Sequence, residues 1–481
     1  MSLDNGIKSI EEKVGFKLLL KKLWPSFLVY NSFAFTISTI FINVLIISNI
    51  MWPGEGFHSY EIGFLAGISM YAMALSGILF GILADRFSRI KLMAFSQTVF
   101  GIGLFLNGFV PDGLGNTTWI LFVILTSLRS FASGGNWPII NSYANDRTEE
   151  KDRSQFFGLL QAFFQLFQIL GMVLSAFLFQ NYFWREYFWF LGIIAIIFGV
   201  LIFIKGIEPK RAATHEELKG ILINAEIKYD YKLNYQSFKS TILKPTNFIA
   251  FIEGLFTTIL ISIPDFLVIA YIQSEVNFSP FAVSIMMILF GLPGGLFGSL
   301  AFAKISDKLG KKNLRNRVYM IFFSAITTFL FFIVIFFLPF PYISSEEGLN
   351  LLVVFSMPIV WIAGLFIFIG RGVMGLWNIN QPPILQAINL PEAQGFISST
   401  NQFLELIGSG SGNILAGFLL AFFDGNYQVT VLLTMSIGII GGFLWLFAAI
   451  WINKDVERIS EILKQRGIEL TSNNNKERVI Q

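Results

Sequence analysis

Long apolar stretches, separated by short polar connections, run through almost the whole sequence. Each is about 20 residues or longer, the length at which a helix crosses a hydrocarbon core of about 30 Å. Because lipid cannot satisfy the backbone of an open sheet, these stretches are predicted to be helices. Twelve spans are predicted, near residues 25–51, 61–84, 90–109, 117–145, 155–181, 184–205, 247–272, 281–304, 317–340, 352–386, 396–423 and 428–452.

A charged stretch, residues 206–246, divides these spans into two groups of six. It is predicted to be a linker between two six-helix bundles, 25–205 and 247–452. Before the first span, residues 1–24 form a charged, amphipathic segment, and residues 453–481 form a polar tail. The fold class predicted from this order is an all-α membrane protein of twelve helices.

Composition supports a membrane protein and excludes several kinds of site. With 54% hydrophobic and 14% charged residues, and a mean hydropathy of +0.66, the 481-residue chain needs lipid as part of its solvent. There is no cysteine, so disulfides, thiol catalysis and thiolate metal sites are excluded. Both histidines, His58 and His215, lie in polar connections. We therefore predict no metal site, no cofactor and no enzymatic activity, and the net charge of +3 gives no indication of nucleic-acid binding.

Basic residues cluster in alternate connections between the spans, and cytoplasmic loops are the ones that retain Lys and Arg. The connection near 390–394 has no positive charge, whereas the tail after 452 is basic. Both termini are therefore predicted to be cytoplasmic, in a monomer of the plasma membrane. The basic connections carry Arg86, Arg89 and Lys91, then Arg147, Lys151 and Arg153, then the linker, then Lys308, Lys311, Lys312, Arg315 and Arg317.

Two motifs recur in the same order in both halves. An acid followed by a basic pair ends the second and eighth spans: Asp85, Arg86 and Arg89, then Asp307, Lys308 and Lys311. An arginine followed seven residues later by an asparagine on the same helical face occurs in the fourth and tenth spans: Arg129 with Asn136, and Arg371 with Asn378. Two repeated motifs favour internal duplication over chance, and hence two parallel, pseudo-symmetric halves.

The first motif resembles the signature of the major facilitator superfamily over residues 25–452. Gly81, Asp85, Arg86 and Arg89 match it, and Ser88 stands where the family has glycine. This resemblance implies a secondary transporter built from two six-helix bundles. The fourth span, from Arg129 to its basic loop, is similar to that of spinster-like lysolipid transporters or organic-anion relatives, which place an acid where this chain has Asn136.

The same resemblance implies a latch between the halves at the cytoplasmic side. Asp85 is expected to face the start of the eleventh helix, near 395–400, and Asp307 the start of the fifth, near 153–157. The six charged residues of the motif are accordingly the predicted gating residues. The alternative is that both acids only orient the basic residues beside them toward the membrane surface.

Few charged residues lie well inside the spans, where such groups usually face a cavity or a partner. They are Arg129, Glu253, Asp265, Arg371 and Glu405. Polar residues at helical spacing accompany them, and Pro264 is expected to kink the seventh span. The predicted substrate-binding residues are Arg129, Ser133, Asn136, Gln161, Gln165, Asp265, Arg371, Asn378, Gln402 and Glu405. The alternative is that these groups only join helices within the membrane.

Two arginines facing one cavity favour an anion, since guanidinium groups bind carboxylate or phosphate through two hydrogen bonds. The first hypothesis is a transporter of an amphipathic organic anion or lysolipid. A sugar or other neutral solute is the second, because Trp137 and Trp377 are suited to stacking on a sugar. A non-transporting receptor or scramblase is the third. If protons are the coupling ion, Asp265 and Glu405 are the predicted coupling acids.

Overall fold

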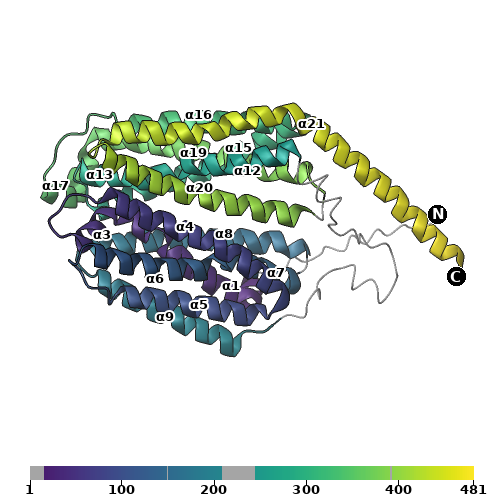
Figure 1. The fold of residues 1–481 in the computed structure, drawn as a ribbon, viewed down its shortest axis with the longest axis horizontal. Coiled ribbons are helices and arrows are strands. Elements are labelled where there is room, and N and C mark those ends of the chain that lie inside the picture. The colour runs from purple at the N-terminus through teal and green to yellow at the C-terminus, as the bar shows by residue number, and fades with distance from the viewer. Residues whose placement is uncertain (1–15, 149, 209–243, 391–392, 481) are drawn as a thin grey trace, which may run out of the picture.

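The computed structural model describes residues 16–148, 150–208, 244–390 and 393–480 (Figure 1). Twelve helical segments of this part of the chain are long and apolar enough to cross a membrane, which confirms the predicted fold class. These spans are Leu18–Ile42, Ser59–Ala84, Arg89–Asn107, Asn116–Ala144, Gln155–Gln180, Trp184–Lys205, Pro245–Ser274, Pro280–Lys312, Arg315–Ile335, Pro358–Ala387, Gln394–Phe422 and Tyr427–Arg466.

The first six spans contain two interrupted helices. The first span breaks at Ser38 and Asn43, and the fourth breaks at Gly135. A Cβ atom at Gly135 would lie 2.4 Å from the ring of Phe80, so glycine permits the close approach of the fourth span to α4. The elements are α1 (Phe16–Ile37), α2 (Thr39–Ile42), α3 (Val44–Met51), α4 (Ser59–Arg86), α5 (Arg89–Asn107), α6 (Asn116–Gly134), α7 (Asn136–Arg147), α8 (Glu150–Gln180) and α9 (Trp184–Lys205).

The last six spans contain two π-helical turns, η1 and η2. Turn η1 begins at Pro264, where the sequence predicts a kink, because proline has no N–H for the helical ladder. The elements are α12 (Pro245–Ile263), η1 (Pro264–Val268), α13 (Ile269–Ser274), α14 (Pro280–Met286), η2 (Met287–Gly291), α15 (Leu292–Lys312), α16 (Arg315–Ile335), α17 (Ser345–Leu349), α18 (Leu351–Ser356), α19 (Pro358–Ala387), α20 (Gln394–Phe422) and α21 (Tyr427–Ile480).

Helix α21 extends well beyond the span near 428–452 predicted for it. It has 54 residues, and at 1.5 Å per residue it is about 81 Å long. Its extension projects from one end of the bundle in Figure 1. Polarity ends the apolar span but does not end the helix, since Lys, Glu, Arg and Leu in the predicted tail all favour helical structure.

The two halves are joined most closely along α4 and α20. Ser59 donates a hydrogen bond to the carbonyl of Gly417 (3.0 Å), and the hydroxyl groups of Tyr71 and Ser411 lie 2.7 Å apart. Glycines permit this contact, because a Cβ atom at Gly63 would lie 3.0 Å from the Cα of Gly417. Small residues commonly let membrane helices approach in this way.

Further contacts between the halves lie at the end of the molecule that contains α3 and α13 (Figure 1). Gln273 of α13 donates to the carbonyl of Ile42 (2.7 Å), and the backbone N–H of Phe281 donates to Gln180 (3.3 Å). Helix α8 packs on α14, at this same end. The halves are therefore closed at the α3–α13 end, opposite the end from which α21 projects.

Candidate functional site

Two of the predicted site residues, Asp265 and Arg371, form an ion pair between η1 and α19. The Arg371 guanidinium donates to both carboxylate oxygens of Asp265, one of them at 3.4 Å. It also lies 5.8 Å from the ring centre of Phe332, within cation–π range. The Asp265 side chain is 44% exposed and that of Arg371 is 19% exposed, so Asp265 is the less buried member of the pair.

Arg129, the counterpart of Arg371 in the repeat, has a different environment. It is buried in α6, its guanidinium lies 6.0 Å from the Phe188 ring centre, and its Nη1 has no hydrogen-bond partner among the described residues. No described acidic side chain forms an ion pair with it. A cavity of about 30 Å³, lined also by Ser133, Phe33 and Met70, adjoins it between α1, α4, α5 and α6.

Glu405 lies beside a second carboxyl group, Glu253, which was not among the predicted site residues. Glu405 accepts a hydrogen bond from Asn401 on its own helix, α20. Glu253 is fully buried in α12 and accepts from Trp377 and Gln381 of α19. The sequence marks Glu253 as a charge within a span, but its neighbours are about 125 or 150 residues away, and no local pattern connects them.

The other predicted binding residues are not gathered with these groups. Asn136 accepts a hydrogen bond from Ser96 (3.0 Å) inside the N-terminal half, where both residues are buried. Gln161, Asn378 and Gln402 are exposed, and Gln165 is half-buried. A role for these four side chains in binding stays a prediction.

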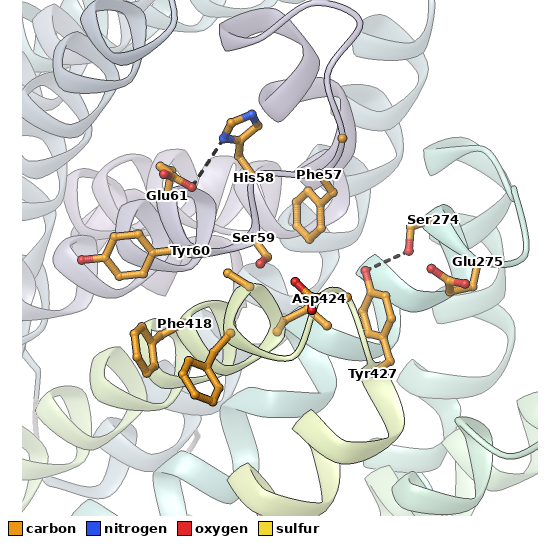
Figure 2. A pocket seen from close by; sticks show the side chains of 15 residues that line it. Phe57, His58, Ser59, Tyr60, Glu61, Ser274, Glu275, Phe418, Asp424 and Tyr427 are labelled. Carbon is orange, nitrogen blue, oxygen red and sulfur yellow. Dashed lines mark hydrogen bonds and ion pairs between the residues drawn. The ribbon is translucent and has the colours of Figure 1, made fainter.

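A larger pocket, about 940 Å³, lies between the halves at the closed end (Figure 2). It is lined by residues after α3, at the start of α4, and at the ends of α13 and α20. His58 stacks on Trp52 and lies 2.9 Å from a carboxylate oxygen of Glu55. Across the pocket, Ser274 donates to the hydroxyl of Tyr427. The predicted substrate-binding residues do not line it.

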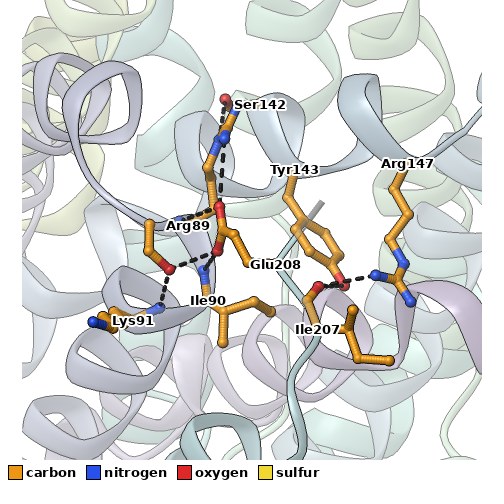
Figure 3. Close-up of polar contacts among 9 residues, drawn as sticks. Arg89, Ile90, Lys91, Ser142, Tyr143, Arg147, Ile207 and Glu208 are labelled. Atoms are coloured by element: carbon orange, nitrogen blue, oxygen red, sulfur yellow. Dashed lines mark hydrogen bonds and ion pairs between the residues drawn. The ribbon is translucent and has the colours of Figure 1, made fainter. Parts of the chain in front are cut away.

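A polar cluster connects the start of α5 to Glu208, which follows α9 (Figure 3). Ser88 caps α5, and its hydroxyl donates to Glu208 (2.6 Å). The backbone N–H groups of Arg89 and Ile90 donate to the same carboxylate (3.1 and 2.9 Å). Partial burial opposes ionisation, but these bonds and the Arg89 guanidinium hold the pKa of Glu208 below its ordinary value.

This cluster gives Arg89, a predicted gating residue, partners within its own half. Its guanidinium contacts Glu208 (3.3 Å) and Ser142 of α7 (3.2 Å). Nearby, Arg147 donates to the carbonyl of Ile207 (2.9 Å). Sequence reasoning missed Glu208 because it lies about 120 residues from Ser88, inside the predicted linker.

For the other gating residues, the structure describes only the second-half motif in full. Asp307 pairs with Arg317 of α16 (2.8 Å), and Arg317 also donates to Asn380 (3.1 Å). Arg86, Lys308 and Lys311 are exposed. The Asp85 side chain and those at 150–154 lie outside the described residues. The latch between the halves stays a prediction.

Comparison with known proteins identifies the family. The model of the Major Facilitator Superfamily matches residues 27–362. A probable sugar efflux transporter of Helicobacter acinonychis is 23% identical over 91% of this chain and 97% of its own length. A cis,cis-muconate transport protein of Acinetobacter baylyi is 29% identical over 31% of this chain and 34% of its own length.

Solved structures show the same fold. A bacterial homologue of the human lysosomal transporter Spinster, inward-facing and unoccupied, has a TM-score of 0.69 and 15% identity, covering 92% of this chain and 99% of that one. A D-xylose–proton symporter has a TM-score of 0.60 and 17% identity, covering 92% and 98%. Because the family model spans most of the sequence, this chain belongs to the Major Facilitator Superfamily, as a multi-pass membrane transporter of small solutes.

Proposed function

We propose that this protein is a secondary active transporter of the plasma membrane that moves an amphipathic organic anion by alternating access. The halves are joined through α2, α3, α13 and α14 at one end. With both termini cytoplasmic, as the basic connections indicate, this closed end would be extracellular. Rocking of two pseudo-symmetric halves about a central site would then expose that site to each side in turn.

The observation that carries the choice of substrate is the buried, uncompensated Arg129. A charge in the membrane interior costs several kcal/mol unless it has a partner. Arg371 has Asp265, whereas Arg129 has a cation–π contact and an Nη1 without a partner among the described residues. A carboxylate or phosphate of the substrate would supply the missing counter-charge, through the two-bond geometry that guanidinium favours.

The surroundings of Arg129 support an amphipathic substrate, with an organic acid or a lysolipid as its two forms. Phe33, Met70, Met73 and Phe100 line the adjoining cavity, together with the hydroxyl groups of Ser130 and Ser133. This cavity is much smaller than the 300–1,000 Å³ typical of ligand sites. Binding would therefore require α1 and α4 to move, which alternating access provides.

A neutral sugar is the second candidate. The relative from Helicobacter acinonychis, which matches along nearly its whole length, is a probable sugar efflux transporter. Trp137 is partly exposed and packs against Tyr30 and Phe157, so it has a face available for stacking. Trp377 is less suited to this role because its indole N–H binds Glu253.

The test is a thermal-shift screen of the purified protein against amphipathic carboxylates, lysophospholipids and sugars, followed by exchange of the binding compound in proteoliposomes. Arg129→Gln is expected to weaken binding of an anion by about 10- to 150-fold, the equivalent of the roughly 1.5–3 kcal/mol of a charged hydrogen bond.

The matched control is Arg185→Gln, which makes the same charge change in a residue paired with Asp112 at the closed end. It should leave binding unchanged. Anion binding that is equally strong in Arg129→Gln would contradict the role of this arginine. Stabilisation by sugars alone would replace the organic anion with the second candidate.

A further inference from the structure

The C-terminal half contains a buried carboxyl group whose polar contacts are all neutral. Glu253 is fully buried between α12 and α19. The indole N–H of Trp377 donates to its Oε1 (2.7 Å), and the amide of Gln381 donates to its Oε2 (3.3 Å). These donors fix the orientation of the carboxyl group but bring no positive charge to it.

A second carboxyl group, from α20, approaches the same position. A Cβ atom at Gly254, the residue after Glu253, would lie 3.3 Å from Cγ of Glu405 and 3.4 Å from Oδ1 of Asn401. The absence of a side chain at Gly254 therefore permits Glu405 to lie against α12. Gln381 of α19 donates to Glu253, so α12, α19 and α20 all contribute groups to this position.

Three basic groups of this half have partners elsewhere. Arg371 pairs with Asp265, and Arg317 pairs with Asp307. Lys244, at the start of α12, donates to the carbonyl of Ile388. In the described part of the chain, no ion pair includes Glu253 or Glu405. The charged group that approaches Glu253 from α20 is Glu405. Helix α19 presents the neutral groups of Trp377 and Gln381, and α21 presents Trp445, whose buried indole N–H has no hydrogen-bond partner among the described residues.

Two ionised carboxylates side by side in this environment would be very unfavourable, because the low dielectric strengthens their repulsion and no cation compensates it. One added proton removes a charge and supplies an O–H donor. An acceptor for that donor is already present, since the buried Oδ1 of Asn401 has no hydrogen-bond partner among the residues described.

We infer that Glu253 and Glu405 form a carboxyl pair that binds one proton and couples it to transport. The proton comes from water at the exposed face of α20, where Gln402 lies one turn before Glu405, and bonds to a carboxylate oxygen of the pair. Of the two predicted coupling acids, Glu405 is kept in this proposal and Asp265 is not, because Asp265 already pairs with Arg371. Coupling rests on the proposed transport function, but proton binding itself does not.

Infrared spectroscopy of the whole protein in nanodiscs tests proton binding without a substrate. A protonated carboxyl group has a C=O stretching band that its carboxylate lacks. The wild type is expected to show this band while the site holds its proton, and Glu253→Gln is expected to lose it. Glu405→Gln should keep the band but displace its pH dependence, since the charge next to Glu253 is gone. Glutamine retains the shape and hydrogen bonding of the protonated acid, which favours normal folding of both variants.

The matched control is Asp265→Asn, which removes an acid of the same half and should leave the band as in the wild type. An unchanged band in Glu253→Gln, or an unchanged pH dependence in Glu405→Gln, would overturn the pair. Loss of the band on addition of Na⁺ at constant pH would assign the site to an alkali cation instead.

Coupling is tested in proteoliposomes that contain a pH-sensitive dye. Any accepted solute should move protons with wild-type protein, whereas Glu253→Gln should exchange solute without proton movement. Solute transport by the wild type without proton movement would overturn the coupling role. If the solute proves to be a sugar, the choice of an anion fails while the proton site remains.

Discussion

The contact of Gly417 with α4 gives a sharp prediction about the closed end of the molecule. Replacing Gly417 with alanine would place a Cβ atom 2.3 Å from the carbonyl oxygen of Ser59 and 3.1 Å from the Cα of Gly63. Both obstructing atoms belong to the backbone of α4, so no side-chain rotation can relieve the clash. We expect Gly417→Ala to separate α4 from α20 and to weaken the closed state at this end.

The structure sets the size of this effect. An ordinary contact at a Cβ atom is 3.4 Å or longer, so the helices must separate by about 1 Å at this level, which also stretches the 3.0 Å hydrogen bond from Ser59 to the Gly417 carbonyl. Overpacking of this kind costs about 1–3 kcal/mol. The gain in helix propensity from alanine is the same in both states and cancels. The ratio of closed to open molecules at this end should therefore fall by roughly 5- to 150-fold.

Because the chain has no cysteine, pairs of spin labels can be placed without removing native thiols. Labels at Glu55 and Asp424, both exposed near the closed-end pocket, should show a longer distance in Gly417→Ala. The control is Gly395→Ala in the same helix, where a Cβ atom meets nothing within 4 Å. An unchanged distance distribution in a correctly folded Gly417→Ala protein would show that the closed state does not depend on this contact.

Two further predictions concern stability, measured by thermal unfolding followed through tryptophan fluorescence. The pKa of Glu208 is lower in the folded protein than in the unfolded chain, so its ionised form stabilises the fold at pH values above its unfolded-state pKa. This stabilisation is lost as the pH falls through the pKa that Glu208 has in the folded protein. Glu208→Gln should lower the free energy of unfolding by about 1 kcal/mol at neutral pH, a figure discounted for the partial exposure of Glu208. It should also make stability depend less on pH in the acid range. If stability falls equally with acid in both proteins, the cluster does not stabilise the fold. Asp307→Asn should lower the free energy of unfolding by less than about 1 kcal/mol, because the Asp307 side chain is 66% exposed. Arg317→Gln should lower it by about 2–3 kcal/mol, because the buried guanidinium also loses its hydrogen bond to Asn380. Similar losses of stability in both variants would contradict this ranking.

The spans and the repeat could be predicted because each depends on local pattern. Apolar runs determine which segments cross the membrane, and the matching arginines indicate related positions in the two halves. The partners of those arginines could not be predicted in the same way. Arg371 has Asp265 only because η1 places that residue beside α19, while Arg129 meets Phe188 of α9. Glu208 and Glu253 likewise depend on helices that are distant in sequence, and periodicity within one helix gives no indication of which neighbour it meets.

The ion pair between η1 and α19 and the carboxyl pair between α12 and α20 both lie in the C-terminal half. In the N-terminal half, the charged residue deep within a span is Arg129. The two halves therefore differ in their electrical properties. One half has a fixed positive charge, whereas the other has a charge that changes with protonation. A membrane voltage acts on each elementary charge with about 2.3 kcal/mol per 100 mV for a complete crossing. The effect of the voltage on the balance between inward- and outward-open molecules thus depends on two things. One is how far the carboxyl pair moves through the field when the C-terminal half moves, and the other is whether the pair holds its proton.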